Sequence, residues 1–145
     1  MTETEAATSE SSAPVSAPAT VADIMRPPVT TVTPNDHVAA AAYLMRRAGA
    51  TALVILHGQT SQPIGLITEA DIVQLVADGR DADEVRIHDL MARQLSLIEA
   101  AASIRDAADT MINGHFRHLP VVSHGGLVGI IDITDICRAL LPAGE

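Results

Sequence analysis

Two short segments of the sequence carry the same spacing of polar residues at the end of an apolar stretch. In the first segment, Gly65-Leu-Ile-Thr68-Glu-Ala-Asp71, a threonine and an aspartate stand three residues apart. We expect Gly65 to allow close backbone approach, Thr68 to be the N-cap of a helix, and Asp71 to be its third residue. A helix start exposes amide donors and a partial positive charge, which suit a hydroxyl-rich or phosphate-bearing ligand.

The same spacing has a purely structural interpretation. Thr-x-x-Asp before an apolar stretch is also a capping arrangement, which stabilises a helix by about 1 kcal/mol whatever binds nearby. On spacing alone, capping is the favoured interpretation. The second segment, Gly129-Ile-Ile-Asp132-Ile-Thr-Asp135, repeats the pattern with an aspartate in place of the threonine.

The two segments recur because the whole sequence after residue 20 consists of two similar copies. Val21–Met25 matches Ile87–Met91 at an offset of 66 residues, and the Gly65 segment matches the Gly129 segment at an offset of 64. Apolar residues at i, i+3, i+4 and i+7 predict one amphipathic helix in each copy. These residues are Val38, Ala41, Ala42 and Met45, with the counterparts Ile104, Ala107, Ala108 and Met111.

Each copy therefore predicts a lead helix, a strand, a long helix, two strands and a final helix. We expect the first long helix to start with Thr33 as N-cap and Pro34 as its first residue. The continuous apolar runs predict strands at Ala50–Leu56, Pro63–Ile67, 115–122 and 127–131. Cys137, the single cysteine, is expected to be a buried small hydrophobe in a helix over Asp135–Leu141.

The charge and the apolar content of the sequence argue against two classes of partner, nucleic acids and membranes. The formal net charge of -9 opposes binding to nucleic acid, and no apolar run is long enough to span a membrane. We therefore expect neither nucleic acid nor a membrane as a partner. Residues 1–20 lack the basic start and the apolar stretch of a secretory signal, so they predict a disordered tail and a cytoplasmic protein.

The motifs together resemble a pair of CBS domains, named after cystathionine beta-synthase. The segments that carry the resemblance are Asp-Ile-Met25, Thr31-Val-Thr-Pro34, Gly-Leu-Ile-Thr-Glu-Ala-Asp71, Phe116-Arg-His-Leu-Pro-Val-Val122 and Gly-Ile-Ile-Asp-Ile-Thr-Asp135. The resemblance implies an α/β fold in which two β-α-β-β-α repeats, 21–80 and 81–141, pack as a pseudo-twofold pair. It also implies a homodimer, because two such modules commonly associate into a flat disc.

The resemblance further implies a regulatory ligand that contains adenosine: AMP, ADP or ATP, or S-adenosylmethionine. Asp71 would accept hydrogen bonds from the ribose hydroxyls, Thr68 would contact ribose or phosphate, and Arg117 with His118 would hold the phosphate. The adenine would lie in an apolar slot around Val29 to Thr31. The full candidate set is Thr68, Asp71, Arg117, His118, Val29, Thr31, Asp132 and Asp135. His118 has an alternative as a strand histidine bonded to nearby backbone.

The two copies differ at these positions. Asp132 stands where Thr68 stands in the first copy, so a phosphate near Asp132 and Asp135 would meet like charge at a cost of about 1 kcal/mol or more. The first-copy counterparts of Arg117 and His118 are Thr51 and Ala52, which carry no charge. The sequence therefore predicts one phosphate-binding cleft. The other cleft would take nothing or an uncharged, nucleoside-like ligand.

The sequence gives little support for a metal site or for catalysis. His115, His118 and His124 do not form the four-ligand set of a structural zinc site. Asp132 and Asp135 are typical of acids that complement a helix dipole rather than of a catalytic pair, and nucleophile-elbow and phosphate-loop motifs are absent from the sequence. We predict a non-enzymatic module that senses cellular energy state and regulates an unidentified protein. The alternative is a ligand-free dimerisation or scaffold module in which the Thr-x-x-Asp motifs serve as caps.

Overall fold

The computed structural model describes residues 20–27, 30–91 and 95–141 of the chain. The first copy forms α2 (Val21–Ile24), β1 (Thr31–Val32), α3 (Val38–Ala48), β2 (Ala52–Leu56), β3 (Pro63–Thr68) and α4 (Glu69–Ala77). The second copy forms the 3-10 helix η1 (Ile87–Leu90), β4 (Ile98–Glu99), α5 (Ile104–Gly114), β5 (His118–Ser123), β6 (Gly126–Asp132) and α6 (Ile133–Ala139). The predicted α/β class and the order of elements are confirmed.

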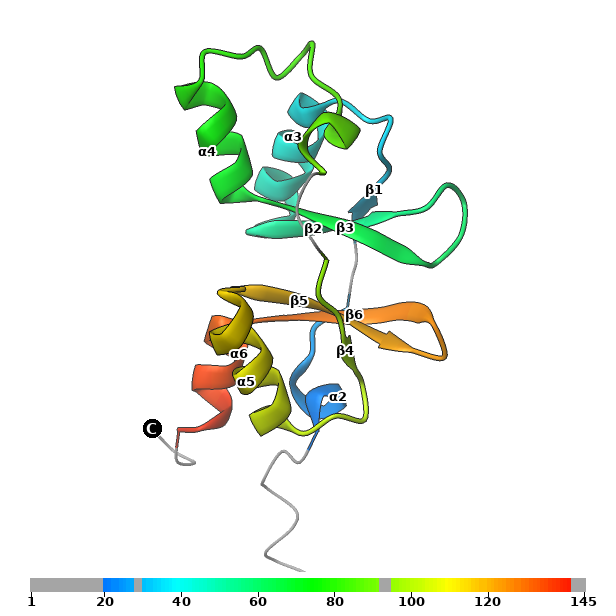
Figure 1. The fold of residues 1–145 in the computed structure, drawn as a ribbon, viewed down its shortest axis with the longest axis vertical. Helices are drawn as coiled ribbons and strands as arrows, with labels where there is room; N and C mark the ends of the chain where they lie inside the picture. The colour runs from blue at the N-terminus through cyan, green and yellow to red at the C-terminus, as the bar shows by residue number, and fades with distance from the viewer. Residues whose placement is uncertain (1–19, 28–29, 92–94, 142–145) are drawn as a thin grey trace, which may run out of the picture.

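Each copy builds its own three-stranded sheet with the same topology. The strand orders are β1-β2-β3 and β4-β5-β6, in which the first pair is parallel and the second pair antiparallel. Helices cover one face of each sheet, and the two sheets face one another across the middle of the molecule (Figure 1). Each central strand, β2 and β5, has four consecutive buried residues, as expected for strands covered on both faces.

The two lead helices exchange places between the copies. In Figure 1, α2 lies beside β6 and α6, in the half that belongs to the second copy. The amide of Val21 donates to the carbonyl of Ala102 at 2.9 Å, which fixes the start of α2 there. Conversely, η1 lies in the first half, where the amide of Ile87 donates to the carbonyl of Asp36 at 2.9 Å.

Each hydrophobic core is therefore completed by a residue from the other copy. Val21 and Ile87 are both 0% exposed, and each packs in the core of the opposite sheet. The first core consists of Val32, Val38, Ala41, Met45, Leu53, Ile55, Ile67, Leu75, Val85 and Ile87. The second consists of Val21, Ile98, Ala107, Met111, Leu119, Val121, Ile131 and Ile136. The exchange holds the two sheets together and so creates the clefts between them.

Three local predictions are wrong in detail. Helix α3 begins at Val38 with His37 as its N-cap, not at Thr33. The carboxylate of Asp36 accepts from the amide of Thr33 at 2.9 Å, which closes a separate turn before the helix. The strand predicted at 115–122 begins later, at His118, because His115 ends α5 in the left-handed region at φ 58. Cys137 is exposed rather than buried.

Candidate functional site

The start of α4 has the predicted geometry. Thr68 is the N-cap, and its hydroxyl oxygen accepts from the amide of Asp71 at 3.3 Å. In return, one carboxylate oxygen of Asp71 accepts from the amide of Thr68 at 2.8 Å and from its hydroxyl at 3.2 Å. The capping interpretation of this motif is thereby confirmed. Both side chains are half-buried, at the point where β3 passes into α4.

The start of α6 repeats the capping box with two carboxylates. Asp132 accepts from the amide of Asp135 at 2.9 Å, and Asp135 accepts from the amide of Asp132 at 2.9 Å. The side chain of Asp135 is only 3% exposed, whereas that of Asp132 is 15% exposed. A buried carboxylate needs a compensating partner, because desolvation penalises its charged form.

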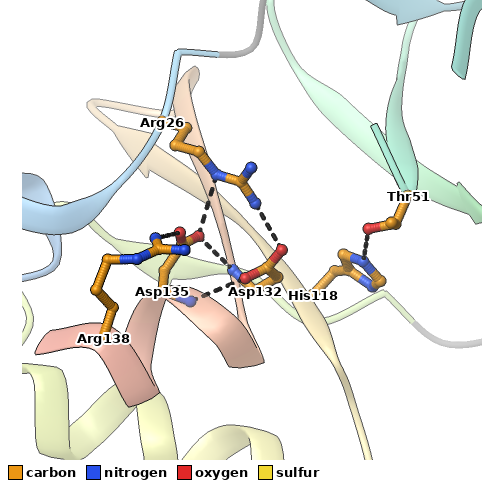
Figure 2. A network of polar contacts seen from close by, with 6 residues as sticks. All are labelled: Arg26, Thr51, His118, Asp132, Asp135 and Arg138. Carbon is orange, nitrogen blue, oxygen red and sulfur yellow. Dashed lines mark hydrogen bonds and ion pairs between the residues drawn. The ribbon is translucent and has the colours of Figure 1, made fainter. Parts of the chain in front are cut away.

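That partner is Arg26, which the sequence analysis missed (Figure 2). Its Nη2 lies 2.5 Å from Asp132 Oδ2, and its Nε lies 3.3 Å from Asp135 Oδ2. Arg138 adds a contact of 3.5 Å to the other oxygen of Asp135. The sequence predicted that the uncompensated charges of Asp132 and Asp135 would repel a phosphate here. That premise is wrong, because the guanidinium of Arg26 bridges the two carboxylates.

The exchanged lead helix explains how Arg26 reaches these carboxylates. Arg26 follows α2 directly, and its backbone pairs with that of Ile130 through two hydrogen bonds of 2.9 Å. A side chain at the neighbouring Gly129 would meet Met25 Sδ at 2.5 Å and the carbonyl oxygen of Arg26 at 3.0 Å. Gly129 therefore permits the close approach of the segment that carries Arg26. The contacts join residues more than a hundred positions apart, which is why no local pattern indicated them.

Two hollows lie between the copies. Cleft A has a volume of about 300 Å³ and is lined by Arg26, Pro27, Thr30, Ala48, Gly49, Ala50, Thr51, Ala52, Leu53, Val54, His118, Ile130 and Asp132. Cleft B has a volume of about 410 Å³ and is lined by Thr51, Leu66, Thr68, Glu69, Ala70, His115, Phe116, Arg117, His118, Asp132, Ile133 and Thr134. Both volumes are at the lower end of the range for small-molecule sites.

Only some of the predicted site residues line these hollows. Thr68, Arg117 and His118 line cleft B together, although they come from different copies. Asp71 lies in the first turn of α4, where it is bonded to Thr68, and it does not itself line either cleft. Thr31 lies in β1, and its neighbour Thr30 lines cleft A rather than cleft B. Val29 lies outside the described residues.

A small recess continues from cleft B. It has a volume of about 60 Å³ and is lined by Ile64, Gly65, Leu66, Leu90, Met91, Leu95, Ser96, Phe116 and His118. Leu66, Phe116 and His118 line both the recess and cleft B. Leu95 and Ser96 are the second-copy counterparts of Val29 and Thr30, so the recess is the symmetry-related equivalent of the apolar slot predicted near the first strand.

His118 lies where the clefts meet, because it lines both of them. Its Nε2 is 2.7 Å from the hydroxyl oxygen of Thr51, across the boundary between the copies (Figure 2). The observed partner is thus a side chain of the other copy, not the nearby backbone of the alternative interpretation. Burial lowers the pKa of His118 below its ordinary value of 6.5, against the opposing charge of Asp132. Burial alone would raise the pKa of Asp132. The hydrogen bond from the amide of Asp135 and the charge and hydrogen bond of Arg26 hold that pKa below its ordinary value.

The lowered pKa of His118 predicts a pH-dependent stability. The unfolded chain binds a proton at His118 near pH 6.5, whereas the folded chain resists protonation until a lower pH. The contribution is therefore fully present above 6.5 and is lost as the pH falls below it. We expect His118→Gln to flatten the fall in unfolding free energy between about pH 7.5 and about pH 5.5, measured by urea denaturation. An unchanged slope would contradict this assignment.

In residues 20–27, 30–91 and 95–141, no three His, Cys, Asp or Glu side chains are grouped as metal ligands. Within the same ranges, no helix has the length and apolar character to cross a membrane.

The fold and the paired clefts define a tandem-repeat regulatory module. The CBS domain model matches residues 21–78 and 87–142, and the chain belongs to the CBS domain family. Proteins of this family are regulatory and signal-transduction modules. The resemblance inferred from the sequence motifs is thereby confirmed, together with the repeat.

Relatives cover nearly all of the two repeats. An uncharacterized 17.7 kDa protein of Acidianus ambivalens is 38% identical over 122 residues, which are 83% of this chain and 73% of that protein. Hypoxic response protein 1 of Mycobacterium tuberculosis is 34% identical over 83% of this chain and 85% of its own length. Other archaeal relatives are longer, and the match spans 42% of a protein from Methanocaldococcus jannaschii.

Two solved structures bear on the ligand. The crystal structure of Hypoxic Response Protein I with two coordinated zinc ions has a TM-score of 0.73 at 32% identity, covering 85% of this chain and 99% of that one. CBSX2 in complex with AMP has a TM-score of 0.67 at 26% identity, covering 83% of this chain and 94% of that one. Relatives of this fold thus include an AMP complex and a zinc complex.

Proposed function

We propose that the chain binds an adenosine-containing ligand, most favourably an adenine nucleotide, in cleft B. The observation that carries the proposal is that Thr68 of one copy lines the same hollow as Arg117 and His118 of the other. A carboxylate can accept both ribose hydroxyls, and Asp71 lies beside Thr68 to do so. The guanidinium of Arg117 offers a planar fork that matches a phosphate.

The adenine would enter the recess next to cleft B. Leu66, Leu95 and Phe116 supply apolar surface there, and Ser96 supplies a hydroxyl and a backbone for polar ring atoms. At about 60 Å³ the recess is small, so we propose that adenine enters with a rotamer change of Met91, a flexible side chain that lines the recess. CBSX2, which shares the fold, has been crystallised with AMP, and this supports the ligand class.

We assign the chain a regulatory rather than a catalytic role, exercised through a homodimer. The outer surfaces of the helices carry apolar side chains that residues 20–27, 30–91 and 95–141 leave exposed, such as Val73, Ile112 and Leu140 at 66%, 74% and 73% exposed. An apolar hollow of about 430 Å³ lies between α5 and α6 and includes the exposed Cys137. Such surface on a small domain is typical of an association site. A ligand would regulate a partner protein only by binding one arrangement of the dimer better than another.

A ligand panel tests this function. Ligand at about 100 times its dissociation constant stabilises the folded state by about 2.7 kcal/mol, which raises the melting temperature by several degrees in a chain of this size. We expect AMP, ADP or ATP to produce the largest shift, with S-adenosylmethionine as the competing candidate. Sedimentation velocity with and without the best ligand should show a dimer in both. If none of these ligands moves the melting curve, the ligand-free scaffold function replaces the sensor.

A further inference from the structure

The apolar hollow between α5 and α6, called hollow C below, lies in the half of the molecule built on the sheet β4-β5-β6. It has a volume of about 430 Å³, and its lining includes Met111, Ile112, Phe116, Ile133, Ile136 and Cys137. Ile112 is 74% exposed and Ile133 is 38% exposed. An apolar hollow with exposed isoleucines favours an apolar protein surface as its occupant.

Hollow C shares a wall with cleft B. His115, Phe116, Arg117 and Ile133 line both spaces. Arg117 is the side chain that we propose holds the phosphate of a ligand in cleft B. An occupant of hollow C therefore contacts the same side chains as that ligand, which is the physical basis for a coupling between the two.

The other half of the molecule, built on the sheet β1-β2-β3, presents an apolar ridge instead. The counterpart of Ile112 there is Arg46. Val73 and Val76 lie three residues apart on α4, on one face of the helix, and are 66% and 65% exposed. Figure 1 shows α4 on the same side of the molecule as α5 and α6, while the hairpin turns β2–β3 and β5–β6 point to the opposite side. One surface thus carries both the ridge and hollow C.

The charges of the long helices favour contact between unlike halves of two copies. Helix α3 carries Arg46 and Arg47 and has no acidic residue in its sequence. The equivalent helix α5 carries Asp106 and Asp109 with a single basic residue, Arg105. All five side chains are exposed. Contact between like halves would bring arginines near arginines or aspartates near aspartates, whereas contact between unlike halves pairs opposite charges.

We propose that hollow C is the seat of α4 from a second copy of this chain, in a dimer in which the first half of each copy packs on the second half of the other. A twofold axis repeats the contact, so each copy supplies one ridge and one hollow, and the assembly closes at two chains. The inference rests on the homodimer of the proposed function and deepens it. It adds the contact surface, the orientation, and the wall through which a ligand in cleft B acts on the dimer.

Disulfide trapping without ligand tests this orientation. Cys137 is the single cysteine of the chain, so Val73→Cys adds one thiol on the ridge. After oxidation with copper-phenanthroline, we expect Val73→Cys to give a covalent dimer on a non-reducing gel. Mass spectrometry should identify the bond as one between position 73 of one copy and Cys137 of the other.

Three chains serve as controls for the trapping experiment. Wild type, Val128→Cys, and Val73→Cys combined with Cys137→Ser should all run as monomers on the gel. Val128 lies in β6, is 36% exposed, and lines neither hollow C nor cleft A or cleft B. Sedimentation velocity before oxidation establishes that each chain is a dimer in solution.

Charge reversal gives a second measurement that does not depend on the distance between two thiols. We expect Arg46→Glu and Asp109→Lys each to weaken the dimer about tenfold in sedimentation equilibrium, because like charges then face one another at both symmetric contacts. The double variant should regain most of the lost affinity, since opposite charges meet again. Circular-dichroism melts establish that each variant is folded.

The outcomes separate this inference from the proposed function. A disulfide between two copies of Cys137, or between two thiols at position 73, would show like halves in contact and overturn the orientation. A dimer without the expected disulfide, in which the double charge variant stays weak, would move the interface away from hollow C. A wild-type chain that sediments as a monomer refutes the homodimer and this inference together, whereas the ligand panel decides binding in cleft B separately.

Discussion

Replacing Asp71 with alanine is expected to weaken the binding of AMP at cleft B by about 10- to 100-fold, because a hydrogen bond to a charged group contributes about 1.5–3 kcal/mol. The expectation follows from the position of Asp71, which is bonded to Thr68 at the edge of cleft B. Titration calorimetry of the wild-type and variant chains with AMP measures the effect directly.

The variant also removes a helix cap, and the control must match that loss. Ser103 is the N-cap of α5, and its hydroxyl oxygen accepts from the amide of Asp106 at 2.9 Å. Ser103 is exposed and lines neither cleft, so Ser103→Ala lowers helix stability by a comparable amount, about 0.5–2 kcal/mol, without touching the ligand. Equal AMP affinities in the two variants would reduce Asp71 to a cap and favour the scaffold function.

The capping motifs show what sequence can predict well. Thr68 and Asp71 are three residues apart, and their hydrogen bonds close within one helical turn, so spacing and residue type were enough to predict the geometry. The same holds for Asp132 and Asp135. The strands followed from apolar runs, and the duplication predicted the second copy from the first.

The start of α3 shows where local patterns fail. Thr33 and Pro34 have the residue types of a helix start, but the helix begins at Val38. Its first amides are satisfied by distant carbonyls: Val38 donates to Val85 at 2.9 Å, and Ala39 donates to Ala82 at 3.0 Å. These partners come from the loop before η1, so the cap of α3 depends on tertiary structure that no window around residue 33 contains.

Arg26 was missed for the same physical reason. Its partners lie 106 and 109 residues away, and the contact exists only because α2 packs on the second sheet. The residues next to Asp132 and Asp135 in the sequence therefore gave no sign of the guanidinium that bridges the two carboxylates. Arg138 of the same helix makes a contact of 3.5 Å with Asp135 only. A pair of carboxylates at a helix start is nevertheless a usable signal, because desolvation requires further cationic partners from elsewhere.

The exchange of lead helices makes a second strong prediction, which concerns stability rather than binding. Ile87 is 0% exposed in the core of the first sheet, although it belongs to the second copy. Truncation of a buried isoleucine to alanine costs about 2–5 kcal/mol, so Ile87→Ala should bring the chain close to unfolding at 37 °C. Urea denaturation monitored by circular dichroism measures the loss. Ile112→Ala, at a side chain that is 74% exposed, should change stability by no more than about 0.5 kcal/mol.

Hydrogen exchange then locates the damage. In Ile87→Ala, amides of β2 and β3 should lose more protection than those of β5 and β6, because the cavity opens in the first core. Val21→Ala should do the reverse, since Val21 is 0% exposed in the second core. If each substitution instead loosened the sheet of its own repeat, the lead helices would not be exchanged in solution. Arg26, which follows α2, would then lose the anchoring on β6 that brings it to Asp132.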